Sequence, residues 1–71
     1  MSIQAINARN QFRGRIRDIV FGDVLSEVDI ETAAGTVTAV FNTRSINELG
    51  LYPGSKVLAL FKATEVAIAR L

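Results

Sequence analysis

Two neighbouring segments with opposite charge patterns constrain the fold of this chain most strongly. In residues 12–20 three arginines stand at alternate positions, and in residues 24–32 three carboxylates do the same. Side chains alternate between the two faces of an extended strand, so each segment places its charges on one face. The pattern predicts two strands with complementary faces, formed by Arg13, Arg15 and Arg17 on one strand and by Glu27, Asp29 and Glu31 on the other.

The short segment between these strands predicts a hairpin. If residues 21–23 form a three-residue loop, with Gly22 at a positive φ, all three arginines come opposite carboxylates. The expected pairs are Arg17 with Glu27, Arg15 with Asp29, and Arg13 with Glu31. Each such pair is worth only about 0.2–1 kcal/mol, but together the three disfavour a register that aligns like charges. We interpret these charges as register control.

The pattern changes in the middle of the chain. A glycine-containing turn at residues 33–36 leads to a third expected strand at 36–42. Ser45 and Glu48 then have the spacing of a capping box, and Gly50 is typical of a left-handed helix end. We therefore expect a helix of little more than one turn, with Ser45 as its N-cap.

The C-terminal third predicts two more strands. A proline-containing turn at residues 52–55 precedes an apolar strand at 56–62, and residues 65–71 are expected to form the last strand. Three strands, a short helix and two strands are the element order of a small all-β, five-stranded, OB-type Greek-key barrel with one short helix between strands 3 and 4. A small SH3-like barrel, which also has five strands, is the alternative. A chain of 71 residues makes one domain, spanning residues 1–71.

Composition narrows the class of protein. Hydrophobic residues make up 49% of the chain, which has no cysteine or histidine to supply a disulfide or a zinc site. So small a domain cannot hide that much apolar surface, and we expect it to self-associate. The net charge of +1 provides no global field to recruit nucleic acid or a membrane surface. No apolar run approaches the length of a membrane span, so a soluble cytoplasmic protein is expected.

The same composition favours binding over catalysis. Without histidine, cysteine or a glycine-rich phosphate loop, the chain lacks the usual bases and nucleophiles, so we expect no enzyme activity and no organic cofactor. No loop gathers the oxygen ligands of a hard metal cation. Parts suited to an oxyanion, namely positive charges, neutral donors and backbone N–H groups, occur in three places. These are the segments "NARN" at residues 7–10, "NTRS" at 42–45 and "KAT" at 62–64.

Two sequence blocks carry a resemblance to a known family. The block "NARNQFRGRI" resembles the "S-A-R-N-Q-x-x-G-x-[VI]" opening of the molbindins, the small Mop-like molybdate-binding proteins of the TOBE/Mop family. The block "SINELGLYPGSKVLALFKATEVAIA" is similar to that family's "S-x-x-E-L-G-L-x-x-G-x-x-V-x-A-x-x-K-A-[ST]-x-V" half. The likeness extends from Asn7 to Ala69. It implies an OB-type barrel that binds molybdate or tungstate at subunit interfaces of a homo-oligomer, a hexamer built as a trimer of dimers, for molybdenum storage or homeostasis.

The resemblance also implies which residues hold the anion. Arg9 and Lys62 would supply the positive charges, and backbone donors would come from around Ala8, Ala63 and Thr64. A second chain would contribute its own set, Asn42, Thr43 and Ser45. This chain has Asn7 where the family usually has serine, and the longer amide side chain is aimed differently. The geometry of the site is therefore expected to differ at that position.

Simpler roles exist for several of these residues. Arg9 is compatible with a solvated arginine before a strand, Ser45 with a helix cap alone, and Lys62 with an edge lysine that discourages aggregation. Asn42 and Thr43 are compatible with a turn. Two other functions also remain open. The aromatic residues could stack on single-stranded nucleic acid, although Phe41 and Phe61 belong to apolar strands and fit a core or an interface better. A purely structural oligomerisation module is the other alternative.

Overall fold

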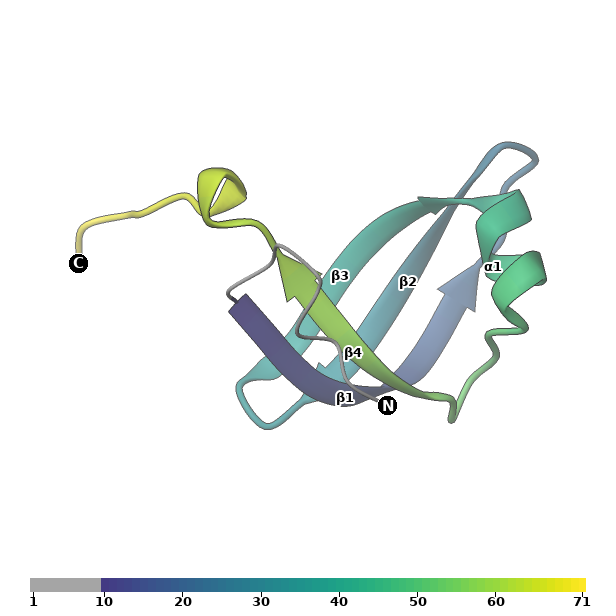
Figure 1. Cartoon of the computed structure of the whole chain (residues 1–71), viewed down its shortest axis with the longest axis horizontal. Helices are drawn as coiled ribbons and strands as arrows, with labels where there is room; N and C mark the ends of the chain where they lie inside the picture. Colours follow the sequence, from purple (N-terminus) through teal and green to yellow (C-terminus); the bar gives the residue numbers. More distant parts are fainter. Residues whose placement is uncertain (1–9) are drawn as a thin grey trace.

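The chain folds into one curled antiparallel sheet and a short helix. The structure is a computed structural model that describes residues 10–71. The sheet has the strand order β3-β2-β1-β4, and Figure 1 shows it strongly curled, with α1 at one end. The strands are β1 (Asn10–Val20), β2 (Leu25–Thr32), β3 (Gly35–Asn42) and β4 (Lys56–Phe61), and the helix is α1 (Thr43–Leu49). This confirms the expected all-β class and the helix between strands 3 and 4.

The long strand β1 is shared between two partners. Its first half pairs with β4, from Asn10 opposite Phe61 to Arg15 opposite Lys56, and its second half pairs with β2. The two pairings overlap at Gly14 and Arg15. A Cβ atom on Gly14 would clash with the backbone carbonyl of Glu31 and lie only 2.9 Å from a methyl carbon of Ile30. Glycine is needed here because β1 and β2 approach each other so closely.

The β1–β2 register differs from the predicted one. Arg15 lies opposite Glu31 and Ile16 opposite Ile30, and after an irregularity at Arg17 the register shifts so that Asp18 lies opposite Asp29. The three predicted charge pairs are therefore wrong. Within residues 10–71 one ion pair is present, between Arg17 Nη1 and Glu31 Oε2 at 3.8 Å, and both of its side chains are about 60% exposed. An exposed pair of this kind contributes about 0–1 kcal/mol.

Burial of apolar side chains explains the observed register. Ile16 and Ile19 are three residues apart, so a regular strand would turn them to opposite faces. The bulge at Arg17 lets both face the core, where Ile16 lies opposite Ile30 and Ile19 opposite Val28. Burying one such side chain stabilises the fold by about 1.5–3 kcal/mol, more than any exposed cross-strand charge pair. Burial of the apolar pairs, and not charge pairing, therefore sets the β1–β2 register.

The loops also depart from the predictions in detail. The β1–β2 loop has four residues, 21–24, and Gly22 does not adopt a positive φ. Glycine is required at position 22 because a Cβ would clash with the carbonyl of Leu25. In the β2–β3 hairpin, Gly35 does have a positive φ of 118°, but it pairs with Thr32 and so begins β3 one residue earlier than expected.

Asn42, not Ser45, caps the helix. The Asn42 side-chain oxygen accepts a hydrogen bond of 2.9 Å from the backbone N–H of Arg44, and Ser45 lies inside α1. The predicted N-cap is therefore wrong. The predicted end is confirmed, since Gly50 is left-handed with φ 64° and the N–H of Leu51 donates to the carbonyl of Ile46. This C-cap fixes Ile46, the buried residue of α1, over the sheet.

A ring of hydrogen bonds places the start of α1. The Gly22 N–H donates to Ser26 Oγ, the Ser26 and Thr43 hydroxyls lie 2.6 Å apart, and Thr43 Oγ1 donates to the Gly22 carbonyl. The Thr43 N–H also donates to the carbonyl of Val24. Ser26 is buried, so these bonds satisfy a polar group that would otherwise be costly to bury. This tertiary anchoring explains why the helix begins at Thr43 and not three residues later.

The core is small and the expected last strand is not formed. Five buried apolar side chains make up the core among residues 10–71, namely Ile16, Val28, Ile30, Ile46 and Ala59. Strand β4 ends at Phe61, the turn η1 (Ala63–Glu65) follows, and residues 66–71 belong to no strand. Figure 1 shows this segment projecting away from the sheet. No strand among residues 10–71 pairs with it. No helix among the described residues is long and apolar enough to cross a membrane.

We predict that Gly14→Ala lowers the free energy of unfolding by about 1–3 kcal/mol, because the added methyl group forces β1 and β2 apart. Urea denaturation followed by circular dichroism measures this change. Arg13→Ala, at the neighbouring exposed position, is the control and should change stability by no more than about 0.5 kcal/mol. Equal effects of the two substitutions would contradict the proposed close approach at Gly14.

A second pair of variants tests which interaction sets the hairpin register. Ile16→Ala removes a buried side chain and should destabilise the fold by about 2–5 kcal/mol. Arg17→Ala removes the exposed ion pair and should cost at most about 1 kcal/mol. The same urea denaturation compares the two variants. A larger loss of unfolding free energy for Arg17→Ala than for Ile16→Ala would mean that charge pairing sets the register.

Candidate functional site

The predicted anion-binding residues fall into three groups. Asn7, Ala8 and Arg9 lie outside the described residues. The second group is at the start of α1 and the third is at η1, and Figure 1 shows these two elements at opposite ends of the long axis of the molecule. One chain therefore does not bring the second and third groups together.

At the start of α1, much of the hydrogen-bonding capacity is already used. The Asn42 side-chain oxygen caps the helix, and both the N–H and the hydroxyl of Thr43 donate within the chain. The Asn42 amide nitrogen still has its N–H groups. Ser45 is exposed, and its hydroxyl makes no hydrogen bond to any of residues 10–71. Of the three predicted residues, Asn42 and Ser45 therefore keep a side-chain donor for a ligand.

The segment from Lys62 to Thr64 is fully on the surface. Lys62 occupies the N-cap position of η1, and its carbonyl accepts a hydrogen bond of 2.9 Å from the N–H of Glu65. The N–H groups of Ala63 and Thr64 stand at the start of this turn, where such groups have no partner within the turn. No ion pair joins the Lys62 ammonium to another of the described residues. The turn thus offers one cation and two backbone donors.

Strand pairing relates this turn to the beginning of the described chain. Asn10, the first residue of β1, lies opposite Phe61, the last residue of β4. In the sequence Asn10 follows Arg9, and Lys62 follows Phe61. The sheet therefore places the start of β1 beside the end of β4, so that "NARN" leads into and "KAT" leads out of the same end of the strand pair.

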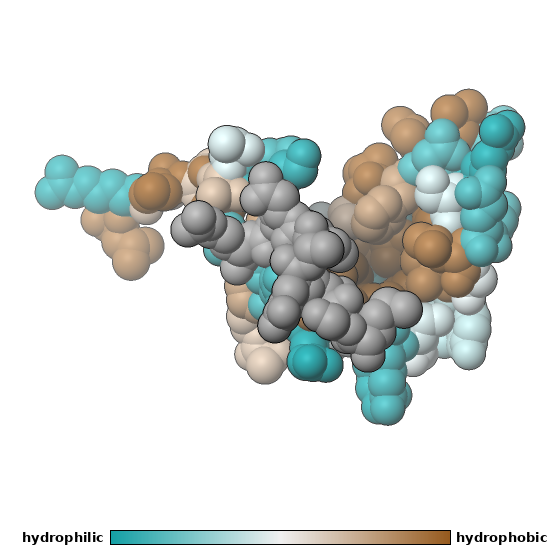
Figure 2. Space-filling model, viewed as in Figure 1, coloured by the Kyte–Doolittle hydropathy of each residue, from teal (hydrophilic) through white to brown (hydrophobic). Residues whose placement is uncertain are grey.

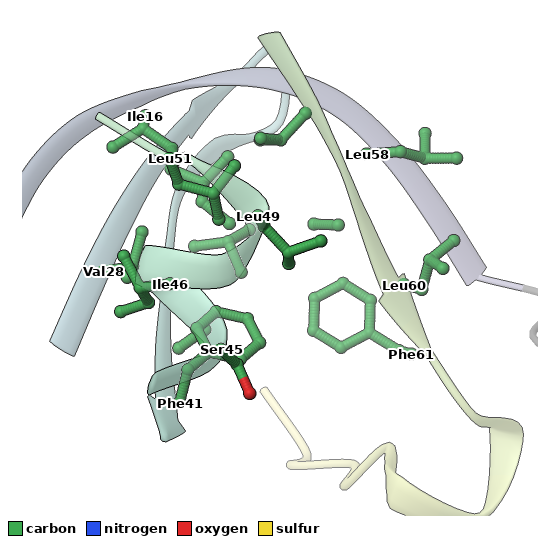
Figure 3. A pocket seen from close by; sticks show the side chains of 15 residues that line it. Ile16, Val28, Phe41, Ser45, Ile46, Leu49, Leu51, Leu58, Leu60 and Phe61 are labelled. Atoms are coloured by element: carbon green, nitrogen blue, oxygen red, sulfur yellow. The ribbon is translucent and has the colours of Figure 1, made fainter. Parts of the chain in front are cut away.

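An apolar cavity that the sequence interpretation did not anticipate lies between the two edge strands. Its volume is about 370 Å³, and Ser45 is the one polar residue among the described residues that line it. Figure 3 shows Ser45 beside Phe41 and Ile46, with Phe61 and Leu60 coming from β4. The remaining lining residues are Ile16, Val28, Ile30, Val37, Ala39, Leu49, Leu51, Val57, Leu58 and Ala59. None of the described residues that line this cavity is charged, so it has nothing to hold an anion. The sequence signal that could have revealed the cavity was the apolar character of Phe41 and Phe61.

A second hollow lies beside the start of α1, and its charges do not suit an anion on their own. It is lined by Asp23, Val24, Asn42, Thr43, Arg44, Asn47 and Glu48. Two carboxylates outweigh one guanidinium there. Nor do residues 10–71 contain any group of three or more acidic, histidine or cysteine side chains that could hold a metal ion. Among residues 10–71, the predicted groups that remain available to an oxyanion are thus the donors of Asn42 and Ser45 and those of residues 62–64.

Comparison with known proteins places the chain in a family. The family model for the TOBE domain matches residues 6–68. Molybdenum-pterin-binding protein 2 of Clostridium pasteurianum is 37% identical over 65 residues, which cover 90% of this chain and 96% of that protein.

Solved structures agree with this result. A molybdate-binding protein from Sporomusa ovata superposes with a TM-score of 0.87 at 32% identity, covering 92% of this chain and 97% of that one. The cytoplasmic molybdate-binding protein ModG, solved with molybdate bound, has a TM-score of 0.77 at 34% identity and covers 82% of this chain and 42% of its own. The OB-type fold class is therefore confirmed, and the chain belongs to the TOBE domain family as one of its Mop-like members.

Proposed function

We propose that this protein binds molybdate, or the similar tungstate, between subunits of a homo-oligomer and serves molybdenum storage or homeostasis in the cytoplasm. The observation that carries this proposal is the match, over 90% or more of the chain, to relatives named for molybdenum-pterin or molybdate binding. The relatives are binding proteins, and we assign no catalytic role to this chain.

The chemistry of the available groups supports an oxyanion. Molybdate is a tetrahedral dianion, so it offers four acceptor oxygens and no donor. The exposed Lys62 ammonium, the N–H groups of Ala63 and Thr64, and the Ser45 hydroxyl are donors without a partner among the described residues. Charge-assisted hydrogen bonds of this type are about twice as strong as neutral ones. The site is thus made of groups that match the ligand.

Charge balance explains why two cations are needed. Glu65 lies in η1 beside Lys62, so this turn is close to neutral as a whole. A dianion would be poorly compensated by it. We propose that Arg9 supplies the second positive charge, together with Asn7 and Ala8 from the same segment. The pairing of Asn10 with Phe61 supports this, since it brings the end of β4 beside the start of β1.

The separation of α1 from η1 supports a site between subunits. Because Figure 1 shows α1 and η1 on opposite sides of one chain, we propose that the Ser45 and Asn42 donors that meet Lys62 come from another copy. Thr43 uses both of its donors within its own chain, so we propose that it positions the helix start beside the anion. A hexamer formed as a trimer of dimers provides interfaces of this kind, and we propose that assembly.

Isothermal titration calorimetry with molybdate tests the site directly. We predict that Lys62→Ala and Arg9→Ala each weaken molybdate binding about 10-fold to 100-fold, the loss expected for a hydrogen-bonded charged contact of about 1.5–3 kcal/mol. Arg15→Ala is the control, because Arg15 is exposed in the middle of β1 and should leave binding unchanged.

The same titration separates the proposed function from its alternatives. Sulfate and a single-stranded oligonucleotide are titrated in parallel with molybdate and tungstate. Absence of heat with both molybdate and tungstate at micromolar protein would contradict oxyanion binding, and heat with the oligonucleotide alone would favour nucleic-acid binding. No heat with any of these ligands would leave a structural oligomerisation module.

A ligand held between subunits should also stabilise the assembly. At a molybdate concentration 100 times its Kd, mass action adds about 2.7 kcal/mol for one site. We predict a rise in the melting temperature with molybdate for the unmodified protein and a much smaller rise for Lys62→Ala. Differential scanning calorimetry measures both, and an equal rise for the two proteins would remove Lys62 from the site.

A further inference from the structure

The outer face of the sheet, which is turned away from the core, carries a pair of acidic side chains. Asp29 lies between the buried residues Val28 and Ile30 of β2, so its side chain points outward. Asp18 of β1 lies directly opposite Asp29, and opposite residues of an antiparallel pair share a face. The Asp29 carboxylate accepts a hydrogen bond of 2.8 Å from the Thr38 hydroxyl, but among residues 10–71 no cation pairs with either aspartate. Repulsion between the two carboxylates is therefore not compensated within this part of the chain.

A pair of basic side chains lies next to the acidic pair on the same face. Arg15 precedes the buried Ile16, so it points outward, and Lys56 of β4 lies directly opposite it. On its other side Arg15 lies opposite Glu31, but that carboxylate already contacts Arg17 at 3.8 Å. Like charges directly opposite each other destabilise a strand pair. The outer face thus carries a basic pair and an acidic pair that are close together along β1.

Exposed apolar side chains extend the acidic end of this face. Val20 of β1 and Val40 of β3 both lie opposite Glu27, one on each side of it, and each is 62% exposed. Leu25, two residues before Glu27 on β2, and Phe21 in the β1–β2 loop are also exposed. Figure 2 shows apolar surface at the end of the molecule that carries this loop. A group of exposed apolar side chains of this kind marks a surface that contacts another molecule.

We propose that the outer face of the sheet is a contact surface for a second copy of the chain, which docks with its strands running in the opposite direction. A two-fold axis that runs across the strands, between the two charged pairs, places the acidic pair of each copy over the basic pair of the other. Such a contact is isologous, because the same surface serves both copies. It compensates both of the repulsions that a single chain leaves on this face.

The charge pattern favours a second copy over other partners. A nucleic acid or an anionic membrane presents charge of one sign, so it would attract Arg15 and Lys56 but repel Asp18 and Asp29. A second copy presents both signs at the required spacing, because the spacing is that of the same face. Complementary charges fix the orientation in which two partners dock, and the apolar side chains add burial to the contact.

This contact is separate from the proposed anion site. The two charged pairs contain none of the predicted anion-binding residues. Ile16, Val28 and Ile30, which line the apolar cavity, point to the opposite side of the sheet. Arg15→Ala therefore remains a control for molybdate binding. If the outer-face contact fails, the proposed function is unaffected, and if molybdate does not bind, the contact is still tested by mass.

Charge reversal tests the contact in the full chain. One variant, Asp18→Arg with Asp29→Arg, makes both pairs positive, and another, Arg15→Asp with Lys56→Asp, makes both pairs negative. In size-exclusion chromatography with light scattering at low salt, each variant alone should have about half the mass of the unmodified protein, because loss of an isologous contact separates its two copies. An equimolar mixture of the two variants should recover the full mass, since the positive face of one complements the negative face of the other.

The mixture and a matched control exclude simpler explanations of a change in mass. Recovery in the mixture shows that both variants are folded. Glu48→Arg reverses an exposed carboxylate of α1 and is the control for the single substitution Asp29→Arg, so it should leave the mass unchanged. A monomeric unmodified protein, reversed variants of unchanged mass, or a mixture that does not recover the full mass would overturn the proposal.

Cysteine labelling tests whether the apolar end of the face is covered. The chain has no cysteine, and Val40→Cys and Tyr52→Cys replace side chains of similar exposure, 62% and 65%. A maleimide should label Val40→Cys about 10-fold more slowly than Tyr52→Cys, because labelling at position 40 requires the contact to open. Adding Asp18→Arg and Asp29→Arg to the Val40→Cys protein should remove this difference. Equal labelling rates without those two substitutions would overturn the contact.

Discussion

The close approach of β1 to β2 at Gly14 is the constraint on which the rest of the structure depends. Because β1 pairs with β4 in its first half and with β2 in its second, the sheet must turn where the two pairings overlap. A side chain at Gly14 would occupy the space of the neighbouring strand. The bulge at Arg17 follows within three residues and adds local twist. Together these features curl a four-stranded sheet until its two edge strands line one cavity.

The curl also explains why the core formed by residues 10–71 is small. A flat sheet of the same strands would present one apolar face to a covering helix, but α1 contributes only Ile46 as a buried residue. The five buried apolar side chains among residues 10–71 are a small core for a chain that is 49% hydrophobic. Edge strands that face each other across an apolar gap leave both hydrogen bonds and surface unsatisfied.

Much of the fold could be predicted from the sequence because local signals agreed with the tertiary structure. The first three strands, the helix end at Gly50 and the turn before β4 depend on alternation and on glycine and proline chemistry, which act over a few residues. The hairpin register could not be predicted in the same way. Charge pairing was the visible signal, but burial of Ile16 and Ile19 contributes more free energy to folding. The bulge that allows this burial cannot be recognised from a strictly alternating sequence pattern. The N-cap was misassigned for a similar reason, since the ring that joins Ser26 and Thr43 to Gly22 is tertiary.

The candidate site could be predicted only in part, because the sequence does not show which of its residues come together in space. Residue type predicts that Lys62 and Ser45 suit an oxyanion, yet no pattern in one sequence places them beside each other. Figure 1 shows α1, which holds Ser45, and η1, which follows Lys62, on opposite sides of one chain. Repulsion between Arg9 and Lys62 would oppose the assembly that unites the site, and a bound dianion would offset that repulsion. Apolar surface buried between subunits would stabilise the assembly without the anion, because burial does not depend on charge. A bound anion would then add its contacts to an assembly that already exists.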